Sequence, residues 1–277
     1  LHNEMRDMDL RSVSEIIHRG GTVLYTARCL EFLTKEGQEQ GAQCCRDNGI
    51  DALVVIGGDG SFKGARALAN LGIPCIGIPG TIDNDIACSE YTIGYDTAMN
   101  TAVEMVDKLR DTTQSHDRCS VVEVMGRHAG YIALNVGIAT GAIATLIPER
   151  PYDLERDILD RMSFTQKTGK KHFIIVKAEG VSGTAQDLAN EIQARTGIDS
   201  RATVLGHVQR GGAPTLRDRV TASQMGYQAV YLLERGIFNR VVAVSADQIV
   251  DYDINVALAM HKTIDTKMID VANTISI

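Results

Sequence analysis

Short apolar runs, each closed by glycine, proline or a charged residue, recur along the chain. This pattern is typical of buried parallel strands that lead into turns. The predicted strands are Ala52–Ile56, Cys75–Ile78, Val121–Val124, Phe173–Val176 and Val241–Val244.

Helix-patterned stretches lie between these runs. Phe62–Leu71 is a predicted helix, with Ser61 as its N-cap and Gly72 as its C-cap. Asp96–Arg110 carries apolar residues on one face, and Val220–Arg235 is a third predicted helix. Strands that alternate with helices indicate an α/β protein with a mostly parallel sheet, and the first strand–helix–strand unit predicts a right-handed crossover.

Composition narrows the class of protein. The 277 residues are 44% hydrophobic and 23% charged, which is enough for a sizeable core in one large or two smaller domains. A net charge of −7 argues against nucleic-acid binding, and no apolar run is long enough to cross a membrane. The six cysteines show no C-x-x-C spacing, so we expect free thiols in a reducing cytoplasm.

A glycine-rich loop, Gly57-Gly58-Asp59-Gly60-Ser61, follows the first predicted strand. Because a helix is expected to begin here, backbone N–H groups of the loop can approach an anion. Asp59 suits such a place if a divalent cation lies between its carboxylate and phosphate oxygens. The alternative is a glycine-rich turn that only packs tightly.

An acidic turn, Pro79-Gly80-Thr81-Ile82-Asp83-Asn84-Asp85, follows the second strand. Parallel strands end at one edge of a sheet, so we expect Asp59, Thr81, Asp83 and Asp85 to converge on one cleft. One carboxylate can orient or deprotonate a hydroxyl, while another can hold a hydrated magnesium ion. The alternative is an Asx-rich loop that caps the following segment.

These segments resemble the 6-phosphofructokinase family. The matching runs are GGDGS (57–61), PGTIDND (79–85), VVEVMGRHAGY (121–131), KAEG (177–180) and RATVLGHVQRGG (201–212). The resemblance implies transfer of the γ-phosphoryl group of MgATP to the 1-hydroxyl of fructose 6-phosphate.

The resemblance also implies roles for single residues. Asp83 is similar to the catalytic base, and Thr81 to a residue beside the transferring phosphate. Asp59 and Asp85 match carboxylates associated with Mg²⁺. The residues expected to meet the nucleotide or the phosphoryl group are Arg28, Gly58, Asp59, Gly60, Ser61 and Arg127.

The 6-phosphate of the substrate needs a receptor of its own. By similarity, His207 and Arg210 of one subunit hold it, with Arg118 and Arg201 arriving from a neighbour. Planar guanidinium groups suit a dianionic phosphate. Residues that match contacts to the sugar are Thr81, Asp83, Met125, Gly126, Arg127 and Glu179. A single arginine can equally be a solvated surface charge, and His207 alone can be a satisfied core histidine.

Two positions separate ATP users from pyrophosphate users in this family. The pyrophosphate users typically carry Asp where this chain has Gly60 and Lys where it has Gly80. A carboxylate at position 60 would repel the α-phosphate of a nucleotide, so ATP is the predicted donor.

The resemblance assigns Arg110 and Lys170 to an effector site. Regulated bacterial members carry Arg, Glu and Lys where this chain has Leu10, Ile143 and Thr168. We therefore expect a weak or altered response to ADP and phosphoenolpyruvate.

The implied architecture is α/β, with two similar doubly wound domains, mostly parallel sheets, and the active site in the cleft between them. The expected ATP-binding domain is 1–94 plus 209–258, and the expected fructose 6-phosphate-binding domain is 95–208 plus 259–277. A cytoplasmic homotetramer follows if Arg118 and Arg201 serve a neighbour. The family's first strand, with a further Gly-Gly-Asp loop, would precede Leu1, so we expect the chain to lack an N-terminal segment.

Three alternatives stay open. The first is a pyrophosphate-dependent enzyme on the same fold. The second is a kinase of another GGDG class, acting on NAD or a lipid, which PGTIDND does not fit. The third is a non-catalytic regulatory member, against which the retention of Asp59, Thr81, Asp83 and Arg127 argues.

Overall fold

The computed structural model describes residue 1 and residues 4–276, and the chain forms two compact units. Unit 1 comprises Leu1–Thr81, Asp85–Gly94 and Ala213–Lys262, and unit 2 comprises Ile82–Asn84, Tyr95–Gly212 and Thr263–Ile277. The chain passes to unit 2 after residue 94, returns to unit 1 at residue 213 and leaves it again at residue 263.

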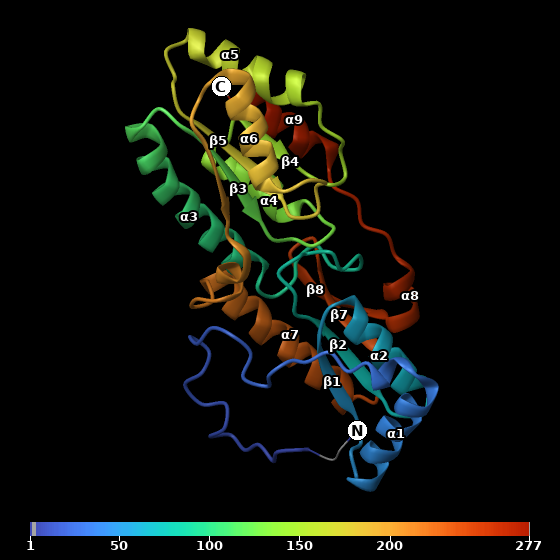
Figure 1. Cartoon of the computed structure of the whole chain (residues 1–277). Helices are drawn as coiled ribbons and strands as arrows, with labels where there is room; N and C mark the ends of the chain where they lie inside the picture. The colour runs from blue at the N-terminus through green and yellow to red at the C-terminus, as the bar shows by residue number, and fades with distance from the viewer. Residues whose placement is uncertain (2–3, 277) are drawn as a thin grey trace. The chain divides into compact units, whose positions relative to one another are not determined.

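Unit 1 is built on a four-stranded sheet in the order β1-β2-β7-β8 (Figure 1). Its strands are β1 (Leu53–Gly57), β2 (Cys75–Pro79), β7 (Arg240–Ser245) and β8 (Gln248–Asp253). The first three run parallel, while β8 returns antiparallel to β7. Ala246 and Asp247, which join β7 to β8, both have positive φ, as a tight hairpin turn requires. The sequence analysis missed β8 because neither residue is the glycine or asparagine that usually marks such a turn.

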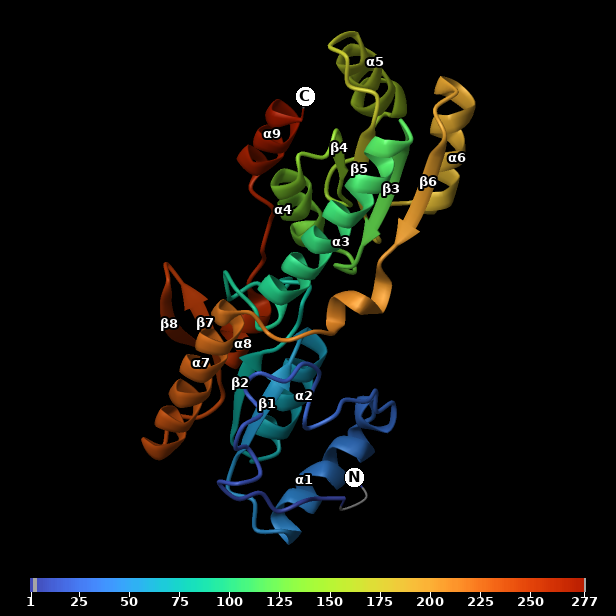
Figure 2. The ribbon, with the colours of Figure 1, turned by 90° about the vertical axis from the view of Figure 1, so that its left-hand side faces the viewer.

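Helices cover both faces of this sheet (Figure 2). One face carries α1 (Lys35–Asp47), α2 (Asp59–Asn70) and α8 (Ile254–Ala259), whereas α7 (Leu216–Glu234) packs on the other. The short helix η1 (Glu31–Leu33) precedes α1, and the described residues before it form turns without a helix or strand. Phe62 of α2 packs beside β2 and Val241 of β7, which places it at the centre of the core on the first face.

The start of α2 corrects a prediction. The helix begins at Asp59 with Gly58 as its N-cap, so Ser61 is not the cap. Ser61 instead packs on Gly57, where a Cβ would lie 2.3 Å from Ser61 Oγ. The prediction was wrong because an extended Gly58 can begin the helix without a side-chain cap. At the other end Leu71 is the C-cap, and Gly72 follows it with a φ of 86°.

Unit 2 is built on an all-parallel sheet in the order β4-β5-β3-β6. Its strands are β3 (Cys119–Val124), β4 (Ala144–Leu146), β5 (Phe173–Ala178) and β6 (Ser200–Val204). The α/β class with mostly parallel sheets is therefore confirmed.

The helices of unit 2 lie on both sides of its sheet (Figures 1 and 2). One side carries α3 (Tyr95–Ser115) and α4 (Tyr131–Thr140), and the other carries α6 (Ala185–Thr196). The C-terminal helix α9 (Thr266–Ile275) packs on α4 and β4. The remaining elements are a π-helical turn η2 (Glu155–Leu159), α5 (Asp160–Lys167) and a 3₁₀ turn η3 (Gly206–Arg210).

Candidate functional site

The glycine-rich loop and the acidic turn meet at the carboxyl ends of β1 and β2. Gly57 is paired with Pro79 in the parallel register, and the N–H of Gly80 donates to the carbonyl of Gly57 at 3.0 Å. A Cβ on Gly58 would lie 3.9 Å from the Cβ of Thr81. The two loops are thus in contact within unit 1, as the parallel pairing predicts.

Asp59 stands in the first turn of α2, where backbone N–H groups are free to bind an anion. Its carboxylate forms an ion pair with Lys63 Nζ at 2.6 Å, and both side chains are about half exposed (47% and 60%). A Cβ on Gly60 would meet no atom within 4 Å. The start of α2 therefore presents donors, a carboxylate and open space side by side.

The acidic turn divides between the two units. Thr81 belongs to unit 1, and its carbonyl accepts a hydrogen bond from Thr92 Oγ1 at 2.6 Å. Asp83 belongs to unit 2 and Asp85 to unit 1, and Asn84 between them has a φ of 51°. Of the four residues expected to converge, unit 1 thus contains Asp59, Thr81 and Asp85.

A lysine that the sequence analysis missed lies close to Asp85. Lys262 Nζ donates to the carbonyl of Ser89 at 2.8 Å. Burial lowers the pKa of Lys262 to about 8, and the nearby carboxylates of Asp85 and Glu90 oppose that shift. No sequence pattern links residue 262 to this turn, so only the fold could identify it.

Arg28 does not join the glycine-rich loop. It lies in the turn-forming segment before η1, is exposed, and makes no hydrogen bond or ion pair with another described residue. Its expected role stays a prediction.

In unit 2, a carboxylate fastens the turn that follows β3. Glu179, directly after β5, accepts at Oε1 the N–H of Gly126 at 3.1 Å and that of Arg127 at 2.6 Å. Gly126 and Arg127 have φ of 142° and 58°, and a Cβ on Gly180 would lie 2.4 Å from the Arg127 carbonyl. The Arg127 side chain extends into solvent from a backbone that this contact fixes.

A buried glutamine joins the same turn to η3. Gln209 is 1% exposed, and its Oε1 accepts the N–H of Met125 at 2.8 Å. Its neighbours His207 and Arg210 are exposed, so the alternative of a core histidine at position 207 is wrong. Met125, Gly126, Arg127, Glu179, His207 and Arg210 all follow the carboxyl ends of β3, β5 and β6. Gln209 was missed because a polar residue between two charged candidates gives no signal of burial.

A buried ion pair supports this edge of the sheet. Lys177, 1% exposed, donates to Glu123 Oε2 at 2.9 Å and to the carbonyl of Val181 at 3.1 Å. Glu123 and Lys177 are paired in register on β3 and β5. The lysine of the KAEG run therefore holds the sheet edge from which Glu179 projects.

Arg118 and Arg201 lie at the opposite edge of the sheet. Arg118 precedes β3 and Arg201 is near the start of β6, and both pair with Asp199, at 2.6 and 3.0 Å. A strand of six residues spans about 20 Å, which separates these two arginines from His207 and Arg210. One unit 2 therefore does not assemble all four predicted phosphate ligands by itself.

Arg110 and Lys170, the predicted effector residues, are brought close together in unit 2. Burial lowers the pKa of Lys170, and the charge of Arg110 lowers it further. His172 joins them, because its pKa is lowered first by burial and then by Lys170 and Arg110. The sequence run Lys170-Lys171-His172 was an available signal for this third residue. Ile143, the position of the missing glutamate, is buried.

The remaining predictions concern cysteines, metals and membranes. All six cysteines are free, and four of them are buried. The described residues contain no group of three or more His, Cys, Asp or Glu side chains that could hold a metal ion. Among the same residues, no helix has the length and apolar character needed to span a membrane.

Comparison with known proteins shows close relatives. The chain is 51% identical over 276 residues to ATP-dependent 6-phosphofructokinase 1 of Clostridium perfringens, covering 100% of this chain and 86% of that protein. It is also 51% identical to ATP-dependent 6-phosphofructokinase of Bacillus thuringiensis, again over 100% of this chain and 86% of the relative. The crystal structure of Pichia pastoris phosphofructokinase in the T-state superposes with a TM-score of 0.87 at 33% identity, covering 97% of this chain and 32% of that one.

The family model described as Phosphofructokinase matches residues 1–233. This range includes the glycine-rich loop, the acidic turn, and the candidate residues at both ends of the unit 2 strands. The chain belongs to the phosphofructokinase family.

Proposed function

We propose that the chain is an ATP-dependent 6-phosphofructokinase that transfers the γ-phosphoryl group of ATP to the 1-hydroxyl of fructose 6-phosphate. The relatives named for this activity support the proposal. The observation that carries it is the contact between the glycine-rich loop and the acidic turn, closed by the Gly80–Gly57 hydrogen bond.

The nucleotide would bind at the start of α2. The exposed N–H groups of this first turn and the space in front of Gly60 suit the phosphates of ATP. Asp59 and Asp85 would hold Mg²⁺, which keeps several waters and is commonly bound by one or two carboxylates together with substrate phosphates. Asp59 is half exposed at the start of α2 and Asp85 belongs to the same unit, so carboxylates of this kind are available for that mode. When bound, Mg²⁺ would neutralise charge on the phosphate oxygens.

Asp83 would act as the general base on the 1-hydroxyl. Phosphoryl transfer depends on positioning and charge neutralisation, so the base would orient the hydroxyl and accept its proton as the bond to phosphorus forms. Arg127 would donate hydrogen bonds to the phosphoryl oxygens from the backbone that Glu179 fixes. Thr81 would lie beside the transferring group, and Arg28 would reach it from the segment before η1.

Fructose 6-phosphate would bind at the carboxyl edge of the unit 2 sheet. Met125, Gly126 and Glu179 would contact the sugar, while His207 and Arg210 would hold its 6-phosphate. Arg118 and Arg201 would complete the receptor of a neighbouring subunit, because they lie at the opposite edge. We infer a homotetramer on this basis, and a cytoplasmic location from the six free cysteines.

Arg110 and Lys170 would form an effector site, with His172 beside them. The two positive charges without the expected glutamate suit an anionic effector. The response to ADP or phosphoenolpyruvate would be weak or altered.

A donor-swap assay tests the proposed function. Purified chain is supplied with fructose 6-phosphate, Mg²⁺ and either ATP or pyrophosphate, and fructose 1,6-bisphosphate is measured by mass spectrometry. We expect product with ATP only. Product with pyrophosphate alone would overturn the choice of donor, and no product with either, from a protein shown by circular dichroism to be folded, would favour a non-catalytic member.

A further inference from the structure

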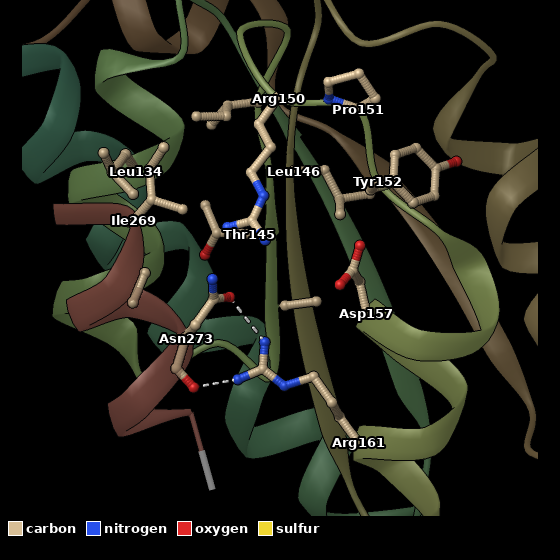
Figure 3. Close-up of a pocket in the computed structure, with 13 residues that line it drawn as sticks. Leu134, Thr145, Leu146, Arg150, Pro151, Tyr152, Asp157, Arg161, Ile269 and Asn273 are labelled. Carbon is tan, nitrogen blue, oxygen red and sulfur yellow. Dashed lines mark hydrogen bonds between the residues drawn. The ribbon is translucent and has the colours of Figure 1, made fainter. Parts of the chain in front are cut away.

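Unit 2 contains a small pocket that the proposed function does not use. It lies among β4, the segment after it, the region of η2 and α5, and α9 (Figure 3). Its volume is about 30 Å³, which is room for about two water molecules. Polar side chains in its lining are Thr145, Arg150, Tyr152, Asp157, Arg161 and Asn273. None of these residues is assigned above to substrate, nucleotide or effector.

Arg161 enters the pocket without a carboxylate partner of its own. Its guanidinium donates to Asn273 Oδ1 at 3.0 Å and to the Asn273 carbonyl, both of which are neutral acceptors. Burial lowers the pKa of Arg161; Asp157 opposes this shift and Arg150 adds to it. The guanidinium is thus positioned firmly while its charge stays incompletely balanced.

Arg150 brings a second positive charge. Figure 3 shows Arg150 and Arg161 directed toward the same region, beside Thr145 and Asn273. The Arg150 side chain forms no hydrogen bond or ion pair within the described part of the chain, and only its backbone N–H donates, to the carbonyl of Ile147 at 3.3 Å. Two guanidinium groups that approach each other repel unless an anion lies between them.

Asp157 offsets the charge of this pair only in part. Its two carboxylate oxygens accept from Arg156 Nε and Nη2, each at 2.8 Å, and one also accepts the N–H of Asp153 at 2.8 Å. The hydrogen bonds from Arg156 lower the pKa of Asp157. Because Arg156 already balances the one acidic residue of the lining, the pocket keeps an excess of positive charge.

A buried hydroxyl in the lining also lacks a partner. Thr145 Oγ1 is the one fully buried side-chain nitrogen or oxygen without a hydrogen-bond partner among the described residues. Buried polar groups are nearly always satisfied, so an unpaired one calls for an unseen water or ligand.

We propose that this pocket binds a phosphate group through Arg150 and Arg161, with Thr145 and Asn273 as additional hydrogen-bonding groups. Guanidinium groups donate paired hydrogen bonds that match phosphate oxygens, and two of them suit a dianion. So small a pocket has no room for a sugar or base and would seat only part of a phosphate group, so the ligand is inorganic phosphate or the terminal phosphate of a monoester, with the remainder in solvent.

Methyl NMR on the whole chain tests the proposal. Ile269 lines the pocket, and its δ1 methyl signal, assigned by an Ile269→Leu variant, reports this place and not the sites proposed above. Inorganic phosphate is titrated at constant ionic strength, with sodium chloride as the compensating salt. We expect a saturable shift of the Ile269 signal that chloride does not produce.

Variants connect the shift to the arginines. Arg150→Met and Arg161→Met are each expected to weaken phosphate binding by about tenfold, the loss of a charge-assisted hydrogen bond. Arg195→Met is the matched control, because Arg195 lies on α6 and pairs with Glu155 outside the lining. The Arg150 side chain has no hydrogen bond or ion pair to lose, and its backbone hydrogen bond to Ile147 survives the substitution, so this variant tests binding even if Arg161→Met unfolds α9. Unchanged binding in Arg150→Met, or no saturable shift in the original chain, would overturn the proposal.

Methyl phosphate separates the two sources of the ligand. Similar affinity for methyl phosphate and inorganic phosphate would indicate a site for phosphate monoesters, whereas a shift with inorganic phosphate alone would indicate a site for the free ion. A failure of this test would leave the donor-swap assay unaffected, because the two experiments report different residues.

Discussion

The carboxylate of Glu179 accepts the backbone N–H of Arg127 at 2.6 Å and thereby joins the end of β5 to the turn after β3. Two consecutive N–H groups share this one oxygen, and the backbone they belong to is held in conformations that residues other than glycine rarely adopt. The contact therefore fixes a strained turn at the edge where we propose that the sugar binds.

Replacing Glu179 should affect binding through this turn. Glu179→Gln keeps an oxygen acceptor but loses its charge, and hydrogen bonds to charged groups are stronger by about 1 kcal/mol. We expect KM for fructose 6-phosphate to rise about five- to tenfold, with a larger rise in Glu179→Ala. Steady-state kinetics measures this, with Glu234→Gln, an exposed residue of α7, as the control. Equal KM values in all variants would contradict a role for the contact.

Asp83 is predicted to be the general base. Asp83→Asn should lower kcat by about 10² or more, because general-base assistance is typically worth that much. KM for fructose 6-phosphate should change little, since the amide can still form hydrogen bonds. Asp107→Asn, on an exposed position of α3, is the matched control. A kcat within twofold of the unmodified chain would remove Asp83 from this role.

The separation of Arg201 from Arg210 predicts complementation between subunits. Arg201→Ala and Arg210→Ala should each weaken fructose 6-phosphate binding strongly. If the two residues reach one site from different chains, equal mixtures refolded together should regain about a quarter of the original sites by random pairing. Activity at subsaturating fructose 6-phosphate measures this recovery. A mixture no more active than its two components would place both residues in one chain's site, or in none.

Gly60 is predicted to select the donor. A Cβ at this position meets no protein atom within 4 Å, and an acidic residue is favourable in a first helical turn. Gly60→Asp should therefore fold normally but use ATP at least about tenfold less efficiently, through repulsion of the nucleotide phosphates. The comparison is kcat/KM for ATP in Gly60→Asp and in Gly60→Asn, which has the same size without the charge. Equal losses in both variants would indicate crowding in place of repulsion.

Thiol labelling should divide the cysteines into two classes. Burial raises the pKa of Cys75 and Cys88 to about 11 and that of Cys119 to about 12, and it also raises the pKa of Cys45. Only a thiolate reacts, so these four should stay unlabelled by a disulfide reagent in the folded chain. Because these pKa values are raised, increasing the pH from 7 to 9 should not convert the four buried thiols to thiolates. Exposed Cys29 should be labelled across this pH range. Mass spectrometry of the labelled peptides would contradict this if Cys75 or Cys119 reacted without denaturant.

Much of the frame of both units was predictable from the sequence. The strand runs at 53–57 and 173–178 lie within a residue or two of their predicted bounds, because both are short apolar runs closed by turn or charged residues. β5 is buried throughout as predicted, whereas the prediction of a buried strand was wrong for β1, where Val54 and Ile56 are exposed. β8 was not predicted, since its hairpin turn lacks glycine.

The candidate site was only partly predictable. The contact between the two glycine-bearing loops follows from parallel pairing, so it could be inferred from sequence order alone. Gln209 and Lys262 act through neighbours distant in sequence, and no local pattern announces such contacts.

The five places where the chain passes between its units have a consequence for how it can be taken apart. Unit 1 is assembled from three separate stretches, so no single cut of the gene yields it whole, and expressing either half of the sequence breaks both cores at once. Obtaining unit 1 alone would require joining its three stretches directly, with short engineered linkers in place of the segments that belong to unit 2.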